Sequence, residues 1–141
     1  MREILFRGKR VNNGEWIQGI YYPVEYTGFN IPGGIDHYII TRLPGGCKPQ
    51  IQVISETVCQ YTGLTDKNGN MIFEGDIVTY DKEYGEEPRE KGVVYWCDGS
   101  FWAENVRDEE DVGLLGVRAN YQLEVIGNIH DNPELLEENN E

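Results

Sequence analysis

Short segments in which apolar and polar residues alternate dominate the chain, and helical periodicity is scarce. Segments 3–10 and 15–22 flank Asn12-Asn13-Gly14, where an Asn-Gly pair supplies the positive φ angles that a tight hairpin turn needs. In the second segment the alternation is not strict around Gly19, which indicates a β-bulge there. The pattern therefore predicts that the chain opens with a β-hairpin.

The same period of two, bounded by Gly and Pro, recurs along the rest of the chain. Further strands are expected at 37–43, 50–55, 57–61, 76–80, 92–97, 100–104 and 121–126. Residues 23–34 are rich in Pro and Gly and are expected to form a long loop, and 81–90 and 107–111 are expected to be acidic loops. Only Asn132-Pro133-Glu134 resembles a helix start, with Asn132 as the N-cap.

These elements predict a mainly β protein with two units. Residues 1–61 are expected to form an N-terminal β-sheet unit, and 62–75 a turn-rich connecting motif. Residues 76–136 are expected to form a small SH3-like β-barrel with a short C-terminal helix, followed by a frayed acidic tail at 137–141.

The clearest hairpin lies at 92–104, around the turn Asp98-Gly99. Counting outward from a two-residue turn gives the expected cross-strand pairs. They are Cys97 with Ser100, Trp96 with Phe101, Tyr95 with Trp102, and Val94 with Ala103. One face then carries only apolar side chains and is expected to be core. Its members are Val94, Trp96, Phe101 and Ala103.

The other face of this hairpin places Tyr95 opposite Trp102, with Glu104 diagonal to the pair. Two aromatic rings beside a carboxylate suit a basic peptide or a methylated ammonium group, through cation–π attraction. The competing interpretation is that the face packs under the N-terminal half or against another subunit. These three residues are the candidate partner-binding site.

Charge is distributed unevenly along the chain, which has a net charge of -13. Residues 1–60 carry 5 acids and 6 bases, whereas residues 61–141 carry 20 acids and 6 bases, a net charge of -14. Because the acidic half repels phosphate, direct nucleic-acid binding is not expected. The basic cluster of the first half is interpreted mainly as a solvated edge; it comprises Arg2, Arg7, Lys9 and Arg10.

Other composition signals point away from secretion, membranes and metal chemistry. No apolar run approaches the roughly 20 residues of a membrane-spanning helix, and the first residues lack the apolar core of a signal peptide. The spacing of Cys47, Cys59 and Cys97 fits neither a disulfide framework nor a zinc site, so free thiols are expected. His37 and His130 lie far apart, without a ligand pattern.

The sequence carries no arrangement of residues typical of a catalytic site, so the expectation is a protein that is not an enzyme and needs no cofactor. No phosphate-binding loop, nucleophile elbow or paired zinc histidines occur. Glu74 and Asp76 flank Gly75 at the start of a strand and are able to hold Mg²⁺ in principle. An Asp at such a position more often fixes a turn through its side chain, which is the favoured interpretation.

Two stretches, 60–69 and 72–78, resemble the signature of the YopX family. The first contains Thr62-Gly63-Leu64-Thr65-Asp66-Lys67-Asn68-Gly69. The ends of the chain, 2–7 and 125–135, are also similar to that family. The resemblance implies a mostly β phage or prophage protein with an SH3-like C-terminal part, present in the host bacterial cytoplasm. It implies no catalytic residues.

The function expected from these observations is that of a non-enzymatic phage accessory protein. It is expected to act through protein–protein contacts with a host or phage protein, and to form a homo-oligomer. Two alternatives remain open. The acidic half is able to mimic DNA and inhibit a host nucleic-acid enzyme, and Glu74 with Asp76 defines the less favoured metal-dependent hydrolase.

Overall fold

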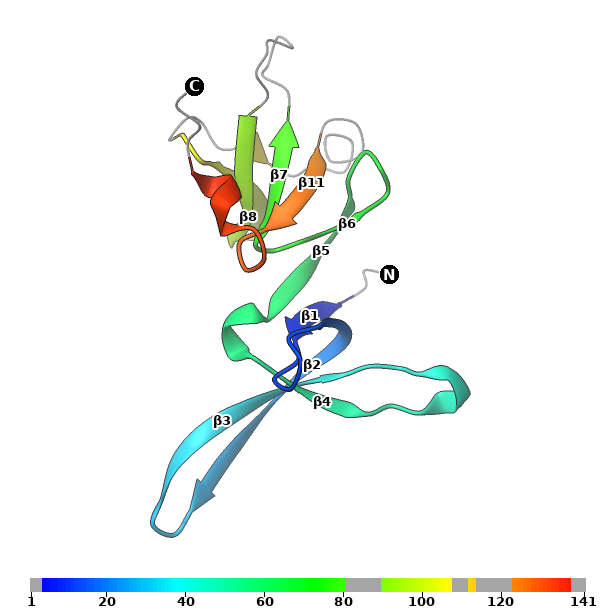
Figure 1. Cartoon of the computed structure of the whole chain (residues 1–141), viewed down its shortest axis with the longest axis vertical. Helices are drawn as coiled ribbons and strands as arrows, with labels where there is room; N and C mark the ends of the chain where they lie inside the picture. Colours follow the sequence, from blue (N-terminus) through cyan, green and yellow to red (C-terminus); the bar gives the residue numbers. More distant parts are fainter. Residues whose placement is uncertain (1–3, 81–89, 108–111, 114–122, 138–141) are drawn as a thin grey trace. The chain divides into compact units, whose positions relative to one another are not determined.

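The computed structural model describes residues 4–80, 90–107, 112–113 and 123–137 (Figure 1). The chain divides into two compact units, residues 1–60 and 61–141. Strands dominate both units, and all strand pairs are antiparallel, so the expected mainly β class is confirmed. Among the described residues, no helix is long and apolar enough to cross a bilayer.

The first unit is a sheet in the order β4-β3-β2-β1, with the start of β5 beside β1. Its strands are β1 (Phe6–Lys9), β2 (Trp16–Gly28), β3 (Ile31–Ile40), β4 (Gln50–Val53) and β5 (Cys59–Thr65); its short 3-10 turns are η1 (Pro44–Gly46) and η2 (Ser55–Thr57). The hairpin expected at the start of the chain is confirmed as β1–β2. Among the described side chains of this unit, the buried apolar ones are Ile39, Val53 and Cys59.

Strand β2 changes its partner at Gly19. Phe6 pairs with Gly19 at the end of the β1–β2 ladder, and Ile20 opens the ladder with β3 by pairing with Ile40. A Cβ added to Gly19 would overlap the carbonyl oxygen of Ile40 and lie 2.9 Å from the Cγ2 of Ile39. The β1–β2 register runs without a shift, so Gly19 marks a close backbone approach in place of the expected bulge.

The expectation of a long loop at residues 23–34 is wrong, because these residues belong to the β2–β3 hairpin. Pro23 lies within the ladder opposite His37, and a proline is tolerated in a strand where its missing N–H is not needed. Further along, the ring of Tyr26 lies across Gly34, at the place where a Cβ would stand. The cross-strand aromatic ring supplies the packing that glycine lacks.

The second unit contains the end of β5 and a five-stranded sheet in the order β10-β9-β8-β7-β11. Its further elements are β6 (Met71–Phe73), β7 (Asp76–Tyr80), β8 (Glu90–Cys97), β9 (Ser100–Asn105), β10 (Val112–Gly113), β11 (Glu124–Asn128) and the 3-10 turn η3 (Pro133–Leu136). The pairings of the described residues do not close this sheet into a barrel. The segment 62–75, expected to connect two units, lies inside this one, as the β5–β6 hairpin and the turn to β7.

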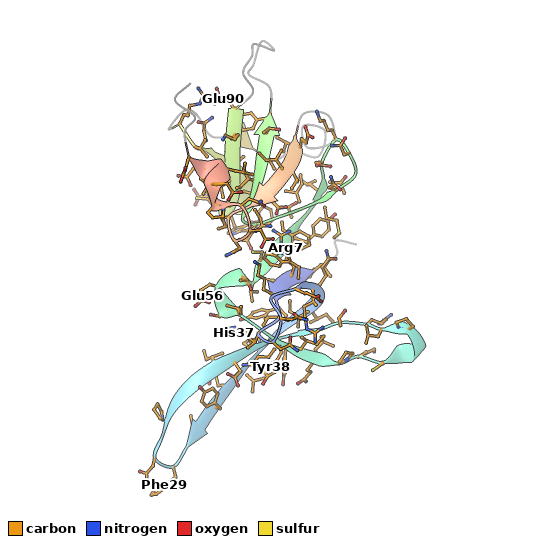
Figure 2. The ribbon with its side chains drawn as sticks, viewed as in Figure 1. Arg7, Phe29, His37, Tyr38, Glu56 and Glu90 are labelled. Atoms are coloured by element: carbon orange, nitrogen blue, oxygen red, sulfur yellow. The ribbon has the colours of Figure 1, made fainter. Side chains whose placement is uncertain are left out.

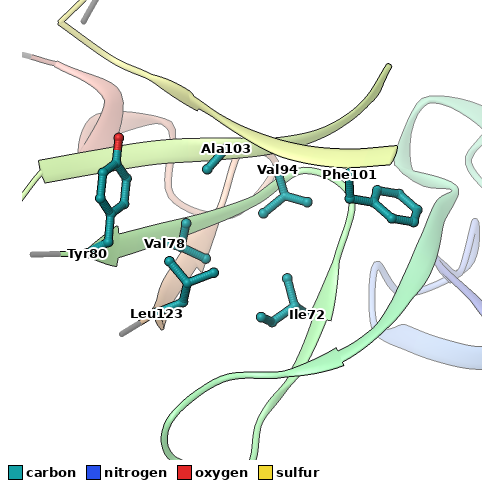
Figure 3. Packing of buried hydrophobic residues seen from close by; sticks show 7 residues of the cluster. All are labelled: Ile72, Val78, Tyr80, Val94, Phe101, Ala103 and Leu123. Carbon is teal, nitrogen blue, oxygen red and sulfur yellow. The ribbon is translucent and has the colours of Figure 1, made fainter. Parts of the chain in front are cut away.

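The core of the second unit gathers side chains from the four strands β6, β7, β8 and β9 and from the residue before β11 (Figure 3). Its members are Ile72, Val78, Tyr80, Val94, Phe101, Ala103 and Leu123. The register expected for the 92–104 hairpin is confirmed in every pair, and Asp98 and Gly99 both take positive φ angles. Trp96 was expected in the core and is 49% exposed, because it lies at the turn end of the hairpin against the edge of the Phe101 ring.

The end of the chain forms a single 3-10 turn, η3, at the place where a short helix was expected. Asn132 does not cap it with its side chain; its Oδ1 accepts a hydrogen bond from the N–H of Asn128 instead. The expected acidic loops at 81–90 and 107–111 lie outside the described residues except for Glu90 and Arg107. The strand expected at 121–126 is confirmed as β11 from Glu124 onward, and residues 121–122 and the tail 138–141 also lie outside the described part.

Candidate functional site

The candidate site predicted on the β8–β9 hairpin is assembled as the register requires. Tyr95 pairs directly with Trp102, and Glu104 pairs with Val93, which places its carboxylate diagonal to Tyr95. Both aromatic side chains are half-buried and Glu104 is exposed. The indole N–H of Trp102 donates to the carbonyl of Cys97 at 3.3 Å, which holds the ring against the strand. The site thus presents two partly accessible rings and one exposed acid.

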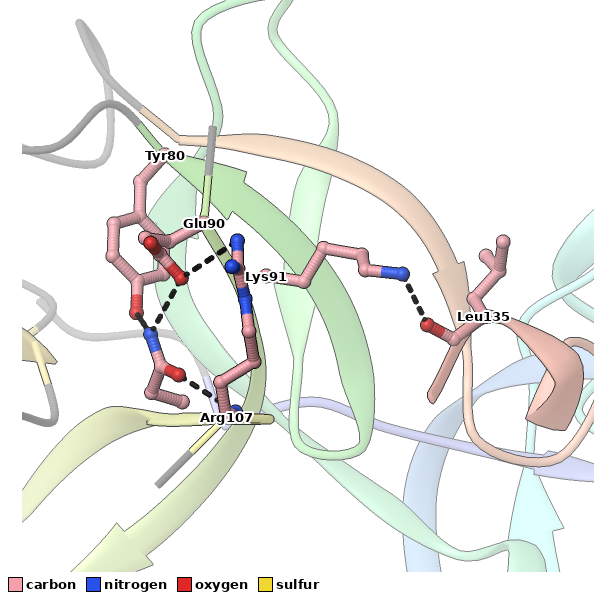
Figure 4. A network of polar contacts seen from close by, with 6 residues as sticks. Tyr80, Glu90, Lys91, Arg107 and Leu135 are labelled. Carbon is pink, nitrogen blue, oxygen red and sulfur yellow. Dashed lines mark hydrogen bonds and ion pairs between the residues drawn. The ribbon is translucent and has the colours of Figure 1, made fainter. Parts of the chain in front are cut away.

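The base of this face is tied to the end of the chain. Lys91 lies on the same side of β8 as Tyr95, and its ammonium group donates to the carbonyl of Leu135 in η3 at 2.7 Å (Figure 4). A hydrogen bond from a charged donor is stronger than a neutral one. The contact therefore fixes η3 at one end of the hairpin, away from the Tyr95–Trp102 pair.

A buried polar network lies on the other side of the hairpin, at the end of the core (Figure 4). Asn105 donates through Nδ2 to the hydroxyl of Tyr80 at 2.8 Å and to Oε2 of Glu90 at 3.2 Å. The guanidinium of Arg107 lies 3.5 Å from the same Glu90 oxygen, and the Arg107 N–H donates to Oδ1 of Asn105. Glu90 is only 2% exposed, so its charge is held by the partners this network provides.

The sequence interpretation missed Glu90 because it counted this residue as the end of an acidic loop. The available signal was its position: Glu90 precedes Gly92 and Val94 by two and four residues, so it shares the inward face of the strand. A buried acid at an inward position requires polar partners, and the side chains of Asn105 and Arg107 contact its Oε2.

Asp66 organises the motif that carried the family resemblance. Its Oδ1 accepts from the N–H groups of Asn68 and Asn70 at 2.9 and 2.8 Å, and its Oδ2 accepts from the N–H of Val125 at 2.9 Å. Burial alone raises the pKa of this carboxyl, but the hydrogen bonds from Val125, Asn70 and Asn68 outweigh it and hold the pKa below its usual value. The carboxylate thus joins the β5–β6 turn to β11.

The metal-dependent hydrolase alternative required Glu74 and Asp76 to face an ion. Asp76 is 1% exposed, and its Oδ2 accepts the N–H of Phe73 at 2.8 Å, so the favoured interpretation of Asp76 as a turn-fixing residue is confirmed. In the ranges that the structure describes, no three His, Cys, Asp or Glu side chains gather to hold a metal ion. The cysteines form no disulfide, as expected.

The basic cluster of the first unit is partly organised by an indole ring. The guanidinium of Arg7 lies 4.7 Å from the centre of the Trp16 ring and the ammonium of Lys9 lies 5.4 Å from it. Arg10 pairs with Val53 through an isolated bridge, and Arg2 lies outside the described residues. Cation–π contacts of this kind stabilise the β1–β2 ladder.

The first unit also exposes apolar side chains that the sequence interpretation did not single out. They follow the β2–β3 hairpin, where Ile20 is 63% exposed, Tyr22 43% and Tyr26 45%. Phe29, at the tip of the hairpin, is 93% exposed (Figure 2). Tyr26 and Phe29 were missed because residues 23–34 were interpreted as a loop, and Ile20 and Tyr22 because the alternation of the expected strand 15–22 was judged irregular around Gly19.

The fold and these surfaces define a small antiparallel β protein of two units with exposed aromatic side chains. The chain belongs to the YopX family, whose model, described as YopX protein, matches residues 6–137. The resemblance noted in the sequence is therefore confirmed. The chain is also similar to a solved structure described as protein EF1440 from Enterococcus faecalis, with 32% identity, a TM-score of 0.58, and coverage of 97% of this chain and 100% of that chain. No curated protein matches the sequence.

Proposed function

We propose that this protein is a non-enzymatic phage or prophage accessory protein that acts in the host bacterial cytoplasm through protein–protein contacts and self-association. Membership of the YopX family supports the phage-type origin. The observation that carries the proposal is the exposure of aromatic and aliphatic side chains on both units. Side chains of this kind form the centres of protein interfaces.

The Tyr95–Trp102 pair is the proposed contact for a host or phage partner. A Lys or Arg side chain of the partner lies over the rings, where cation–π attraction is available, and the exposed Glu104 carboxylate pairs with its charge. The five-stranded antiparallel order supports an SH3-like barrel as the scaffold of this unit. A rigid sheet suits the role, because both rings are presented by paired strands.

Replacing Trp102 with alanine is expected to weaken partner retention by about tenfold or more, because hot-spot tryptophans carry a large share of binding energy. The measurement is affinity capture from a bacterial host lysate on the immobilised chain, followed by titration of the purified retained protein. Trp96→Ala is the matched control, since Trp96 lies on the opposite face of the same hairpin and is 49% exposed.

Equal losses of binding for both tryptophan variants would contradict the assignment of the contact to the Tyr95–Trp102 face. A strictly monomeric wild-type chain that retains no protein would contradict the proposed function as a whole. Circular dichroism of each variant separates a binding defect from loss of the fold.

A second candidate function is supported by the net charge of -14 over residues 61–141. An acidic surface is able to mimic the phosphate ladder of DNA and to occupy the DNA site of a host nuclease or repair enzyme. If so, the chain is expected to compete with duplex DNA for a restriction nuclease, and the competition disappears at high salt. Nuclease activity that the chain leaves unchanged at low salt excludes this function.

A further inference from the structure

The β2–β3 hairpin extends beyond the strands that support it. Strand β4 pairs with His37–Ile40 of β3, and β1 pairs with Trp16–Gly19 of β2. Residues 24–36 therefore form a two-stranded arm, whose described pairings join only β2 and β3. A two-stranded hairpin is marginally stable in water unless its apolar surface packs against something.

The two faces of this hairpin differ in what covers them. On one face the ring of Tyr21 lies 5.3 Å from that of Phe6 and 5.8 Å from that of His37, and the Tyr21 hydroxyl contacts His37 Nδ1 at 2.5 Å. Ile39 and Val53 are buried on this face, so the first unit packs its small core there.

The other face, here called the tyrosine face, comprises Ile20, Tyr22, Val24, Tyr26, Tyr38 and Ile40. Its side chains meet in cross-strand pairs, with Ile20 opposite Ile40 and Tyr22 opposite Tyr38. Ile20, Tyr22 and Tyr26 remain between 43% and 63% exposed. A contiguous apolar row of this kind on a sheet face marks an interaction surface.

We propose that two copies of this chain pack their tyrosine faces against each other. The inference rests on the proposed function, whose self-association it assigns to one surface.

Charge favours a second copy as the occupant. Asp36, opposite Val24, is a charged side chain of this face, and the β1–β2 ladder places Arg7 and Lys9 at the other end of the same face, because they pair with Gln18 and Trp16. In a two-fold contact between identical faces the acidic end of one copy is able to meet the basic end of the other, whereas the acidic residues 61–141 would repel their own copy.

Geometry and area favour the same occupant. An antiparallel strand pair has a local two-fold axis, so its face is able to meet an identical face in an isologous contact. Ile20, Tyr22 and Tyr26 are only 43% to 63% exposed, so complete coverage of this face in both copies buries at most about 1,000 Å² in total, an area that fits a weak, reversible dimer. Association by pairing an extra strand with the free edge of β2 is less favourable than face-to-face packing, because Pro23 has no N–H to donate to such a strand.

The test uses the full chain, analysed by light scattering and sedimentation over about 1 to 100 µM, a range that brackets weak specific dimers. Ile20→Ser is expected to raise the dimer dissociation constant by about tenfold or more. Ile35→Ser is the matched control, because Ile35 is 50% exposed on the opposite face of the same arm. Its dissociation constant is expected to stay within about twofold of wild type.

A second variant, Tyr26→Lys, places a charge on the tyrosine face at an exposed position and is expected to abolish the dimer. Circular dichroism establishes that each variant keeps the wild-type strand content. A dimer that survives both Ile20→Ser and Tyr26→Lys, or that Ile35→Ser weakens equally, overturns the assignment while self-association stands. A wild-type chain that stays monomeric throughout overturns the inference together with the self-association in the proposed function.

Discussion

Asp66→Ala is expected to lower the free energy of unfolding of the second unit by about 3 to 5 kcal/mol, because hydrogen bonds to a buried charged group contribute about 1.5–3 kcal/mol each and their donors would lose them. The donors are the N–H groups of Asn68, Asn70 and Val125. Urea denaturation followed by tryptophan fluorescence measures the change. A loss below about 1 kcal/mol would show that water replaces the carboxylate without cost.

The same carboxyl gives this unit an acid-sensitive stability. Because the folded-state pKa of Asp66 lies below its unfolded value, its contribution is present above the unfolded pKa and is lost as the pH falls through the folded pKa. Asp66→Asn removes this titration and is expected to flatten the loss of stability between neutral and acidic pH. Glu104→Gln is the matched control, because it removes one exposed acid of the same unit and leaves the hydrogen bonds of Asp66 intact.

Gly19→Ala is expected to destabilise the first unit by about 3 kcal/mol or more, at the upper end of overpacking costs, because the added methyl meets backbone that cannot rotate away. The obstacle is the carbonyl of Ile40, with the Ile39 side chain 2.9 Å from the new Cβ. Loss of β signal in circular dichroism and a lower melting temperature measure the effect.

Gly33→Ala serves as the control for this substitution, because its nearest described neighbour, the carbonyl of Tyr26, would lie 3.3 Å from the new Cβ. Its effect is expected to stay within about 1 kcal/mol. Equal melting temperatures for the two alanine variants would contradict the close approach at Gly19.

Local turn chemistry was the part of the fold that the sequence predicted best. Asp98-Gly99 fixes the register of its hairpin, because two residues with positive φ allow one set of cross-strand pairs. The Tyr95–Trp102 pairing follows from that count without any tertiary information. Asp66 lies in the segment 62–75 that was expected to be rich in turns, but its bond to Val125, 59 residues away, depends on the tertiary fold.

Long-range context explains the parts that the sequence did not predict. Pro23 and Gly34 are of residue types that are typical of loops. They lie in strands because the β2–β3 ladder tolerates a proline at position 23 and because the Tyr26 ring packs over Gly34. Glu90 has the composition of an acidic loop and is buried because Asn105 and Arg107 arrive from β9 and the turn after it. Each outcome depends on a partner distant in sequence, which local patterns do not encode.

The partner change of β2 at Gly19 also sets the order in which the first unit is able to assemble during synthesis. Strands β2 and β3 are neighbours in sequence and close through a short connection, so they can pair once Ile40 has left the ribosome. Phe6 of β1 pairs with Gln60, so that part of the ladder must wait until Gln60 has been made. A nascent chain is therefore able to form its aromatic arm before the β1–β5 part of the base is complete, and the proposed contact with a second copy would cover that arm.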